Sequence, residues 1–398
     1  MFLPIGDEPN PKGVAWVNWA LILTNVAIYV LVTFPLSATP VDPNDPALPQ
    51  YLDVVRQLSG GQLSARALTQ QTSAYDLYVF THGFRPAAPT VATAFHAMFL
   101  HAGFFHLAGN MLFLWIYGDN VEARLGRVTY LVGYLVTGLA GNLFHLVLAG
   151  ASPMPLVGAS GAISGVLGFY FVCFPENRVR MLITLFPIFM KVVRIRSRWV
   201  LGAYFVLDNL LPVAVGVRSS VAFGAHIGGF VGGVVLALWM RHRDRVVPSG
   251  EAHALHADEV RIPTGAHAAA QQVTASLAAR DVAGAVALYL AGMGKPWQAQ
   301  VTASDRLIMA DWLAAQGHAR AALAVYEQVL AVDHTPADLA RADLGAGLVL
   351  LHGLGRATDA WQHLMRAQRM TPDAAVRAQA EQTMYRIQDL QKLKFRGQ

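Results

Sequence analysis

The residues best suited to chemistry in this sequence begin with a serine between small residues. Ser160 lies in the stretch Gly158-Ala159-Ser160-Gly161, at the head of an apolar run that continues to Phe174. Pro153 and Pro155 precede the stretch, so we expect a helix to begin here. A serine at a helix N-terminus lies beside free backbone N–H groups, which can hold an anion. Ser160 could therefore be a nucleophile beside part of an oxyanion hole.

A second interpretation of the same stretch is structural. Small residues recur here at four-residue spacing, and membrane helices often use such residues where they pack against each other. Under this interpretation Gly158, Gly161 and Gly165 are helix-packing residues. The stretch by itself leaves both interpretations open.

Other polar residues in apolar surroundings could complete a site. They are His106, Asn110 and His226. Gly229 and Gly233 follow His226 at the third and seventh positions, so all three residues share one face of a helix. This small face could pack against the glycines after Ser160. The packing would bring an imidazole base to the serine hydroxyl, which is the pairing that a serine nucleophile needs.

Composition places these residues in a membrane protein. The 398 residues are 54% hydrophobic and only 14% charged, with a mean hydropathy of +0.39, whereas soluble proteins carry about 25% charged residues. The net charge of +5 is small for this length, so we expect no nucleic-acid partner. Cys173 is the single cysteine, which excludes an internal disulfide framework and a cysteine-built metal site. We expect no metal and no cofactor.

Six apolar runs could each cross a lipid bilayer. The expected spans are residues 14–34, 95–117, 128–149, 156–174, 199–215 and 221–240. We expect a charged turn at residues 118–127, an interfacial connector at 178–198 and a long loop at 35–93 that contains a short helix within 52–70. Lysine and arginine concentrate at 178–198 and after residue 241, which marks the cytoplasmic side. Both termini are then cytoplasmic, and the 35–93 loop faces outward.

The tail has a different character. Residues 1–242 form the expected membrane domain, 243–265 a polar linker, and 266–398 a soluble helical domain. Similar segments begin at Gly317 and Gly355, a step of 38 residues, and they resemble tetratricopeptide repeats, whose usual period is about 34. An ordinary helical bundle is the alternative. The expected fold class is thus all-α, with a protein partner for the tail.

The expected topology brings the polar residues to one depth. Spans two, four and six all run inward from the outer face, and Ser160, His226, His106 and Asn110 all fall in their outer parts. Polar groups within a bilayer are costly and tend to face the bundle interior or a water-filled cavity. Four such groups at one level indicate a site below the outer surface.

Three motifs now stand in order on these spans. They are His106-x-x-x-Asn110, Gly158-Ala159-Ser160-Gly161 and Ala225-His226-Ile227-Gly228-Gly229. In this order the motifs resemble the rhomboid family of intramembrane serine proteases, over about residues 14–241. Some members carry a tyrosine four residues after the serine, stacked on the histidine, whereas this sequence has Ser164. The resemblance therefore leaves open what orients His226.

The resemblance implies a role for each residue. Ser160 would be the nucleophile and His226 the general base of a dyad without aspartate. The Ser160 backbone N–H, His106 and Asn110 would hold the oxyanion. Span five resembles the lateral gate of the family, so Asp208 could line the entry of substrate; a hydrogen bond to a neighbouring helix is the alternative. His96, His101 and His106 follow one another at steps of five residues and do not share a helical face, so we expect no metal site.

The sequence thus predicts an intramembrane serine endopeptidase that lies in a cell membrane. In a bacterium this would be the inner membrane. It would hydrolyse transmembrane segments of other proteins near the outer face. The alternative is a non-catalytic rhomboid-like adaptor that holds client helices while its repeat-like tail recruits partners.

Overall fold

The structure is a computed structural model that describes residues 2–11, 13–58, 65–185, 189–217, 221–332 and 334–395. The chain forms two compact units. The first comprises Met1–Glu8 and Gly13–Ala237, and the second comprises Pro9–Lys12 and Leu238–Gln398. The domain boundary expected after residue 242 falls inside one helix, Phe223–Asp244.

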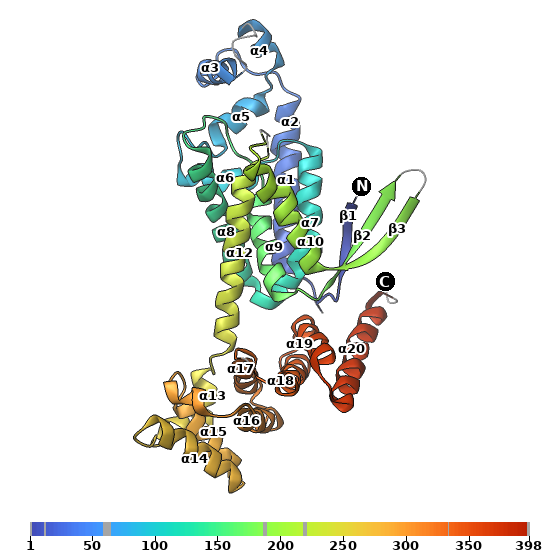
Figure 1. The fold of residues 1–398 in the computed structure, drawn as a ribbon. Coiled ribbons are helices and arrows are strands. Elements are labelled where there is room, and N and C mark those ends of the chain that lie inside the picture. Colours follow the sequence, from blue (N-terminus) through green and yellow to red (C-terminus); the bar gives the residue numbers. More distant parts are fainter. Residues whose placement is uncertain are drawn as a thin grey trace. The chain divides into compact units, whose positions relative to one another are not determined.

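The first unit is built around a bundle of helices (Figure 1). Its long elements are α1 (Trp16–Ile28), continued by a π-helical segment, Tyr29–Thr33, and by α2 (Phe34–Ser37); α7 (Phe104–Leu125); α8 (Arg127–Ala149); α9 (Ser160–Cys173); α10 (Ser197–Phe205), continued by the π-helical segment η2 (Val206–Leu210) and by α11 (Leu211–Ala214); and α12 (Phe223–Asp244). Helix α9 contacts α7, α8 and α10. The helix that begins at Ser160 therefore lies at the centre of the bundle.

Three stretches within the described residues are long and apolar enough to cross a membrane. They are Trp16–Ser37, Arg127–Ala149 and Phe223–Ala254. Helix α9 is apolar but has only 14 residues, and α7 carries Asp119, Glu122 and Arg124 in its last two turns. The six-span topology therefore remains a proposal.

The expected second span and the turn after it are wrong in their boundaries. The chain forms α6 (Val91–Ala97), breaks, and starts α7 only at Phe104; α7 then continues to Leu125 through most of the expected charged turn. Its acidic residue Glu122 is buried and accepts hydrogen bonds from the backbone N–H groups of Val17 and Asn18 at 3.2 and 2.7 Å. The carboxylate thus satisfies free donors at the start of α1, which is why a charge can lie inside the bundle.

The all-α expectation is also wrong in one region. Residues expected as an interfacial connector form a hairpin, β2 (Arg178–Leu185) and β3 (Phe189–Arg196), and β1 (Phe2–Glu8) completes a three-stranded antiparallel sheet in the order β1-β2-β3 (Figure 1). Val179 and Met181 are buried while Arg178 is exposed. This alternation, together with the β-branched residues, is typical of a strand. Residues 186–188 lie outside the described residues.

The 35–93 loop is largely helical and positions the serine. It contains α3 (Leu48–Leu58), α4 (Ala65–Gln71), α5 (Ala74–His82) and α6; residues 59–64 of the helix expected within 52–70 lie outside the described residues. Phe84 and Leu156 exchange backbone hydrogen bonds of 3.0 and 2.8 Å, and Gly158 N–H donates to the Ala97 carbonyl at 2.8 Å. The segment before Ser160 is therefore tied to this loop.

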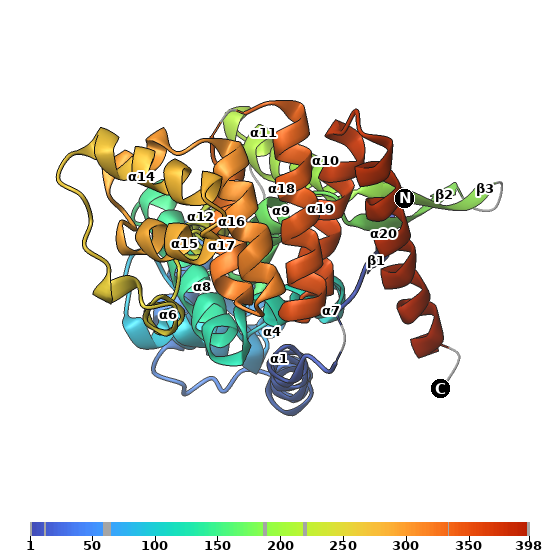
Figure 2. The same cartoon turned by 90° about the horizontal axis from the view of Figure 1, so that it is seen from below.

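The second unit is a succession of short helices. These are α13 (Ser249–Ala254), α14 (Ala266–Ala278), α15 (Val282–Ala291), α16 (Ala303–Ala315), α17 (Ala319–Leu330), α18 (Pro336–Leu348), α19 (Ala357–Met370) and α20 (Ala374–Phe395). Figures 1 and 2 both show them following one another in chain order from α14 to α20. The segment expected as a linker contains α13 and buries Val247 and Ala257 in the core of this unit. Helices packed in sequence suit the repeat-like interpretation, which stays a proposal.

Candidate active site

The site begins with a serine and a histidine on different helices. Ser160 is the first residue of α9, where the prolines predicted a helix start. His226 lies in the first turn of α12. Its Nε2 is 2.8 Å from Ser160 Oγ. The two residues that the sequence analysis paired are therefore within hydrogen-bond distance, although 66 positions separate them in the chain.

Glycines make this approach of two helices possible. A Cβ added to Gly229 would lie 1.9 Å from the Gly161 carbonyl oxygen, and one added to Gly233 would lie 1.8 Å from the Gly165 carbonyl oxygen. Backbone therefore meets backbone where α9 crosses α12, with no room for a side chain. The packing interpretation and the chemical one describe a single arrangement, because the close crossing carries His226 to Ser160.

Gly158 has a different role from the one expected. It lies before α9, not in it, with a positive φ of +132°. A Cβ at Gly158 would lie 2.9 Å from His106 Nε2 and 3.5 Å from Ser160 Oγ. Gly158 therefore admits the His106 imidazole beside the serine and does not mediate a contact between helices.

Asn110 supplies a free hydrogen-bond donor. It follows His106 by four residues on α7, so the two side chains lie on one face of that helix. Its side chain is buried, and Nδ2 has no acceptor within hydrogen-bond distance among the described residues. A buried unpaired donor is costly and needs an explanation. Together with the Ser160 backbone N–H at the start of α9, it is suited to an oxygen that becomes negative during a reaction.

A residue that the sequence analysis did not assign completes the contacts of His226. Asn209, in η2, places Oδ1 2.8 Å from His226 Nδ1. Its side chain is only 1% exposed. The available signal was an amide in an apolar span, since such polar residues are functional candidates by default. That rule directed attention to the adjacent Asp208, whose side chain is exposed.

The remaining histidines and Ser164 lie around this centre. His101 is buried and its ring forms a T-shaped pair with that of His106, the centroids 5.3 Å apart, whereas the ring of His96 lies 6.2 Å from that of His82. Across the described part of the chain, no three His, Cys, Asp or Glu side chains converge on a possible metal site. Ser164 is buried within α9.

Comparisons with known proteins concern the segment that holds this site. Residues 88–243 match the Rhomboid domain. The chain is 35% identical over 139 residues to "Rhomboid protease GluP" of Bacillus subtilis (strain 168), which covers 35% of this chain and 25% of that protein. It is 33% identical over 141 residues to "Rhomboid protein 1, mitochondrial" of Saccharomyces cerevisiae, a match that covers 34% of this chain and 38% of that protein. It is 30% identical over 147 residues to "Putative rhomboid protease YdcA" of Bacillus subtilis, with 35% of this chain and 61% of that protein covered.

These matches concern one segment. The similarity spans between a quarter and about three-fifths of the relatives' own lengths. The Rhomboid match at residues 88–243 includes Ser160, His226 and Asn209. The comparisons therefore support the rhomboid family for the segment that holds Ser160 and His226.

Proposed function

We propose that this chain is an intramembrane serine endopeptidase that hydrolyses peptide bonds in or near transmembrane segments of other proteins. The observation that carries the proposal is the 2.8 Å contact between Ser160 Oγ and His226 Nε2. It joins a serine at a helix N-terminus to an imidazole, and α7 carries a buried amide donor, Asn110, that has no partner among the described residues. Ser160 is the nucleophile and His226 the general base.

The reaction follows from these positions. Ser160 Oγ attacks the scissile carbonyl carbon while its proton passes to His226 Nε2. The Ser160 backbone N–H, His106 and Asn110 stabilise the oxygen that becomes negative. His226 then returns the proton to the leaving amine as the C–N bond breaks, which leaves an acyl-enzyme. Water, deprotonated by His226, hydrolyses the ester and restores the serine hydroxyl.

The membrane setting defines the substrate class. A transmembrane helix keeps its backbone groups in internal hydrogen bonds, because lipid offers no partners. A peptide bond can reach Ser160 only where that helix locally unwinds, so segments with small or helix-weakening residues are the expected substrates. We further propose six spans with both termini cytoplasmic, so that cleavage occurs near the outer face.

The α10–α11 segment is the proposed entry for substrate. Asp208 lies on η2 within it and is exposed, together with the neighbouring apolar side chains Val206, Leu207 and Leu211. An exposed apolar helix beside the serine is a suitable surface for another transmembrane helix. Asp208 is proposed as a residue of this gate, and the helices of the second unit as a binding domain for a protein partner.

The test compares the wild type with Ser160→Ala. Both are purified in detergent and incubated with a fluorophosphonate probe and with a panel of single-span substrates. The proposal expects probe labelling and cleavage by the wild type and neither by Ser160→Ala, with equal yield and helix content. Full cleavage by purified Ser160→Ala would contradict the proposal.

The second candidate function is a non-catalytic adaptor. The observation in its favour is the second unit, whose helices from α14 to α20 pack in chain order as partner-binding repeats do. An adaptor predicts a wild type that binds transmembrane segments but neither reacts with the probe nor cleaves them. Deleting residues 266–398 then separates the roles, since an adaptor loses its partner while a protease retains probe labelling.

A further inference from the structure

We infer that Asn209 is a positioning residue that fixes the tautomer and the orientation of His226. The inference rests on the proposed function, because it concerns the base of that dyad. Asn209 Oδ1 lies 2.8 Å from His226 Nδ1, on the side of the ring opposite the nitrogen that faces Ser160. A histidine base must present one nitrogen without a proton, and the partner of its other nitrogen decides which one that is.

The orientation of the Asn209 amide follows from its other contact. Asn209 Nδ2 donates to the backbone carbonyl oxygen of Tyr204 at 3.1 Å. A carbonyl oxygen can only accept, so the NH2 end of the amide must face Tyr204. The amide oxygen therefore faces His226. If the amide were reversed, its oxygen would face the Tyr204 carbonyl oxygen, one acceptor against another, and its NH2 group would point at the His226 ring.

This orientation determines the proton on the imidazole. Because Asn209 Oδ1 only accepts, Nδ1 of neutral His226 carries the proton and donates it. Nε2 then keeps its lone pair and accepts the hydroxyl proton of Ser160. When Nε2 takes that proton during attack, Nδ1–H stays bonded to Asn209, so the ring does not turn away. In this way Asn209 does what a triad aspartate does for orientation, without a charge.

The local backbone explains why an asparagine can reach this position. Asn209 lies in η2, a five-residue π-helical segment between α10 and α11. The extra residue of a π-turn changes the direction in which the side chains point around the helix axis, and such segments are frequent at functional sites. Leu207 is 57% exposed and Leu210 is 38% exposed, whereas Asn209 is 1% exposed. A single amide is thus turned inward from a segment whose other side chains are exposed.

Two features make this bond important for the dyad. The position four residues after the serine is Ser164, which has no ring to stack on His226. A neutral amide also avoids the cost of burying a second ionised group next to the histidine. The titratable groups that act on His226 from the surrounding helices are His106 on α7 and His145 on α8, and Asp208 neighbours Asn209 on η2.

The experiment measures kcat, KM and the pH–rate profile for Asn209→Ala and Asn209→Asp in the full chain. Asn142→Ala is the matched control. Asn142, on α8, is also buried, and its side chain donates to the Ala94 carbonyl oxygen at 2.8 Å. Asn209→Ala should lower kcat by about 10- to 100-fold with little change in KM, the loss expected for a buried hydrogen bond. Asn142→Ala should reduce stability and leave both kcat and the profile as in the wild type.

Asn209→Asp supplies a readout that a merely structural role would not move. The carboxylate keeps the acceptor at Nδ1, so activity should exceed that of Asn209→Ala. Its negative charge favours the imidazolium, so the acid limb of the profile should move to higher pH by about one unit. A profile unchanged in Asn209→Asp, or a kcat unchanged in Asn209→Ala, overturns the inference while the dyad proposal stands. Absence of cleavage and of Ser160 labelling in the wild type would instead reject the dyad itself.

Discussion

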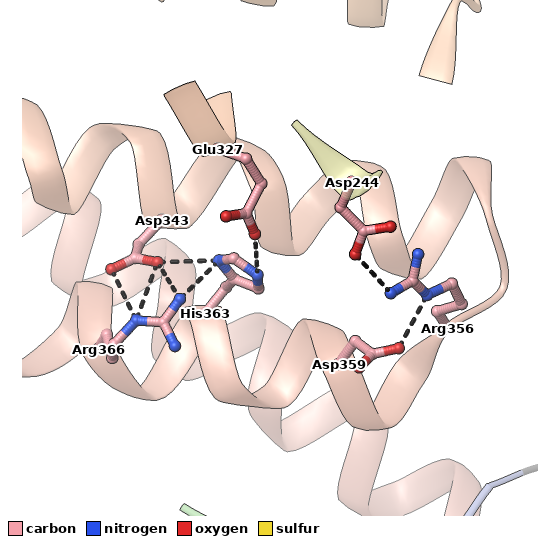
Figure 3. A network of polar contacts seen from close by, with 7 residues as sticks. All are labelled: Asp244, Glu327, Asp343, Arg356, Asp359, His363 and Arg366. Carbon is pink, nitrogen blue, oxygen red and sulfur yellow. Dashed lines mark hydrogen bonds and ion pairs between the residues drawn. The ribbon is translucent and has the colours of Figure 1, made fainter. Parts of the chain in front are cut away.

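Two histidines, one in each unit of the chain, lie in opposite surroundings; His226 is partly buried and His363 is buried. His226 contacts a hydroxyl and an amide, both neutral, through Ser160 and Asn209. His363, on α19, contacts two carboxylates (Figure 3): its Nδ1 is 2.9 Å from Asp343 and its Nε2 is 3.3 Å from Glu327. The first set of partners suits a base that must gain a proton, and the second suits a histidine that already holds one.

The charges around His363 balance within the second unit. Arg366 donates to Asp343 at 2.7 Å and so shares that carboxylate with His363 (Figure 3). Burial and the Arg366 charge would lower the pKa of His363, but its contacts with Asp343 and Glu327 outweigh them and the pKa is raised. Burial would likewise raise the pKa of Glu327, yet His363, Arg366 and Arg241 lower it to about 2. A buried charge here is matched by an opposite one, as stability requires.

The comparison teaches that the partners of a histidine, more than its burial, indicate its use. Removing each histidine tests this with the largest expected effect. His226→Ala should lower kcat/KM by about 10⁴- to 10⁶-fold, because the nucleophile loses its base, while the unfolding temperature hardly changes. His363→Ala should keep the dyad reactive but destabilise the second unit by about 3–5 kcal/mol, because two buried carboxylates lose a cation.

Both variants are measured by fluorophosphonate labelling and by hydrogen exchange of α17 to α19. The expected results assign a role in the reaction to His226 and a role in stability to His363. A His226→Ala protein that still cleaves, or a His363→Ala protein with unchanged exchange in α17 to α19, would show that the two surroundings do not separate these roles.

The second prediction concerns the first unit, where α9 and α12 cross closely through glycines; the network around His363 in the second unit is held by charged side chains instead. Gly233→Ala places a methyl group 1.8 Å from the Gly165 carbonyl oxygen, so α9 and α12 must separate. We expect a stability loss of about 1–3 kcal/mol. Cleavage should fall by about 100-fold, because a displacement of about 1 Å between reacting groups has that effect.

Gly109→Ala is the control for this change. Gly109 lies on α7, and a Cβ there would meet nothing within 4 Å. The substitution should raise helix stability slightly, by about 0.5–1 kcal/mol, with cleavage unchanged. Equal effects of the two substitutions on cleavage would mean that the close crossing does not set the distance between Ser160 and His226.

The contact between Ser160 and His226 could be predicted from the sequence, because each residue lies at a helix start beside small residues. The spacing of Gly229 and Gly233 after His226 is a direct signature of a close crossing. Asn209 could not be assigned in this way. Its inward direction depends on the π-helical shift in η2, which regular helical spacing does not indicate. Reading span five as an ordinary helix favoured its neighbour Asp208.

The errors in the fold share one physical origin. Glu122 and Asp7 are charged residues that patterning alone would place in water. Both are buried: Glu122, on α7, accepts hydrogen bonds from the start of α1, and Asp7 contacts the Asn120 amide at 2.9 Å and the Tyr170 hydroxyl. Partners that are distant in sequence decide such placements. The strand β1 was missed for the same reason, since it pairs with β2 across some 170 residues.

The third prediction is the pH dependence of stability in the second unit. The folded pKa of His363 lies above its ordinary value of 6.5, so its contribution is full below that pH and is lost as pH rises through the folded pKa. The folded pKa of Glu327 is about 2, against an ordinary 4.5, so its contribution is full above 4.5 and is lost as pH falls toward 2. The unit should be most stable between these limits.

Hydrogen exchange in α17 to α19, corrected for the intrinsic pH dependence of exchange, measures this window. In His363→Gln the decline above pH 6.5 should disappear, because Gln does not titrate. The acid decline should shrink as well, because Glu327 loses the partner that does most to lower its pKa. A wild-type protein whose protection of α17 to α19 rises steadily through pH 8 would contradict a protonated His363.

The last prediction, which has the smallest expected effect on activity, contrasts substitutions at two aspartates, Asp343 and Asp208. Asp343 is 1% exposed and bonds His363 and Arg366, whereas Asp208 is exposed on η2. Asp343→Asn should therefore destabilise the second unit strongly, while Asp208→Asn should leave folding and probe labelling unchanged, since exposed charges contribute less than about 1 kcal/mol. If Asp208 lines the entry, cleavage of transmembrane substrates should change by about 2- to 5-fold through KM, an effect of less than 1 kcal/mol. Loss of probe labelling in Asp208→Asn would instead place Asp208 in the dyad's own surroundings, beside Asn209, and would remove it from the gate.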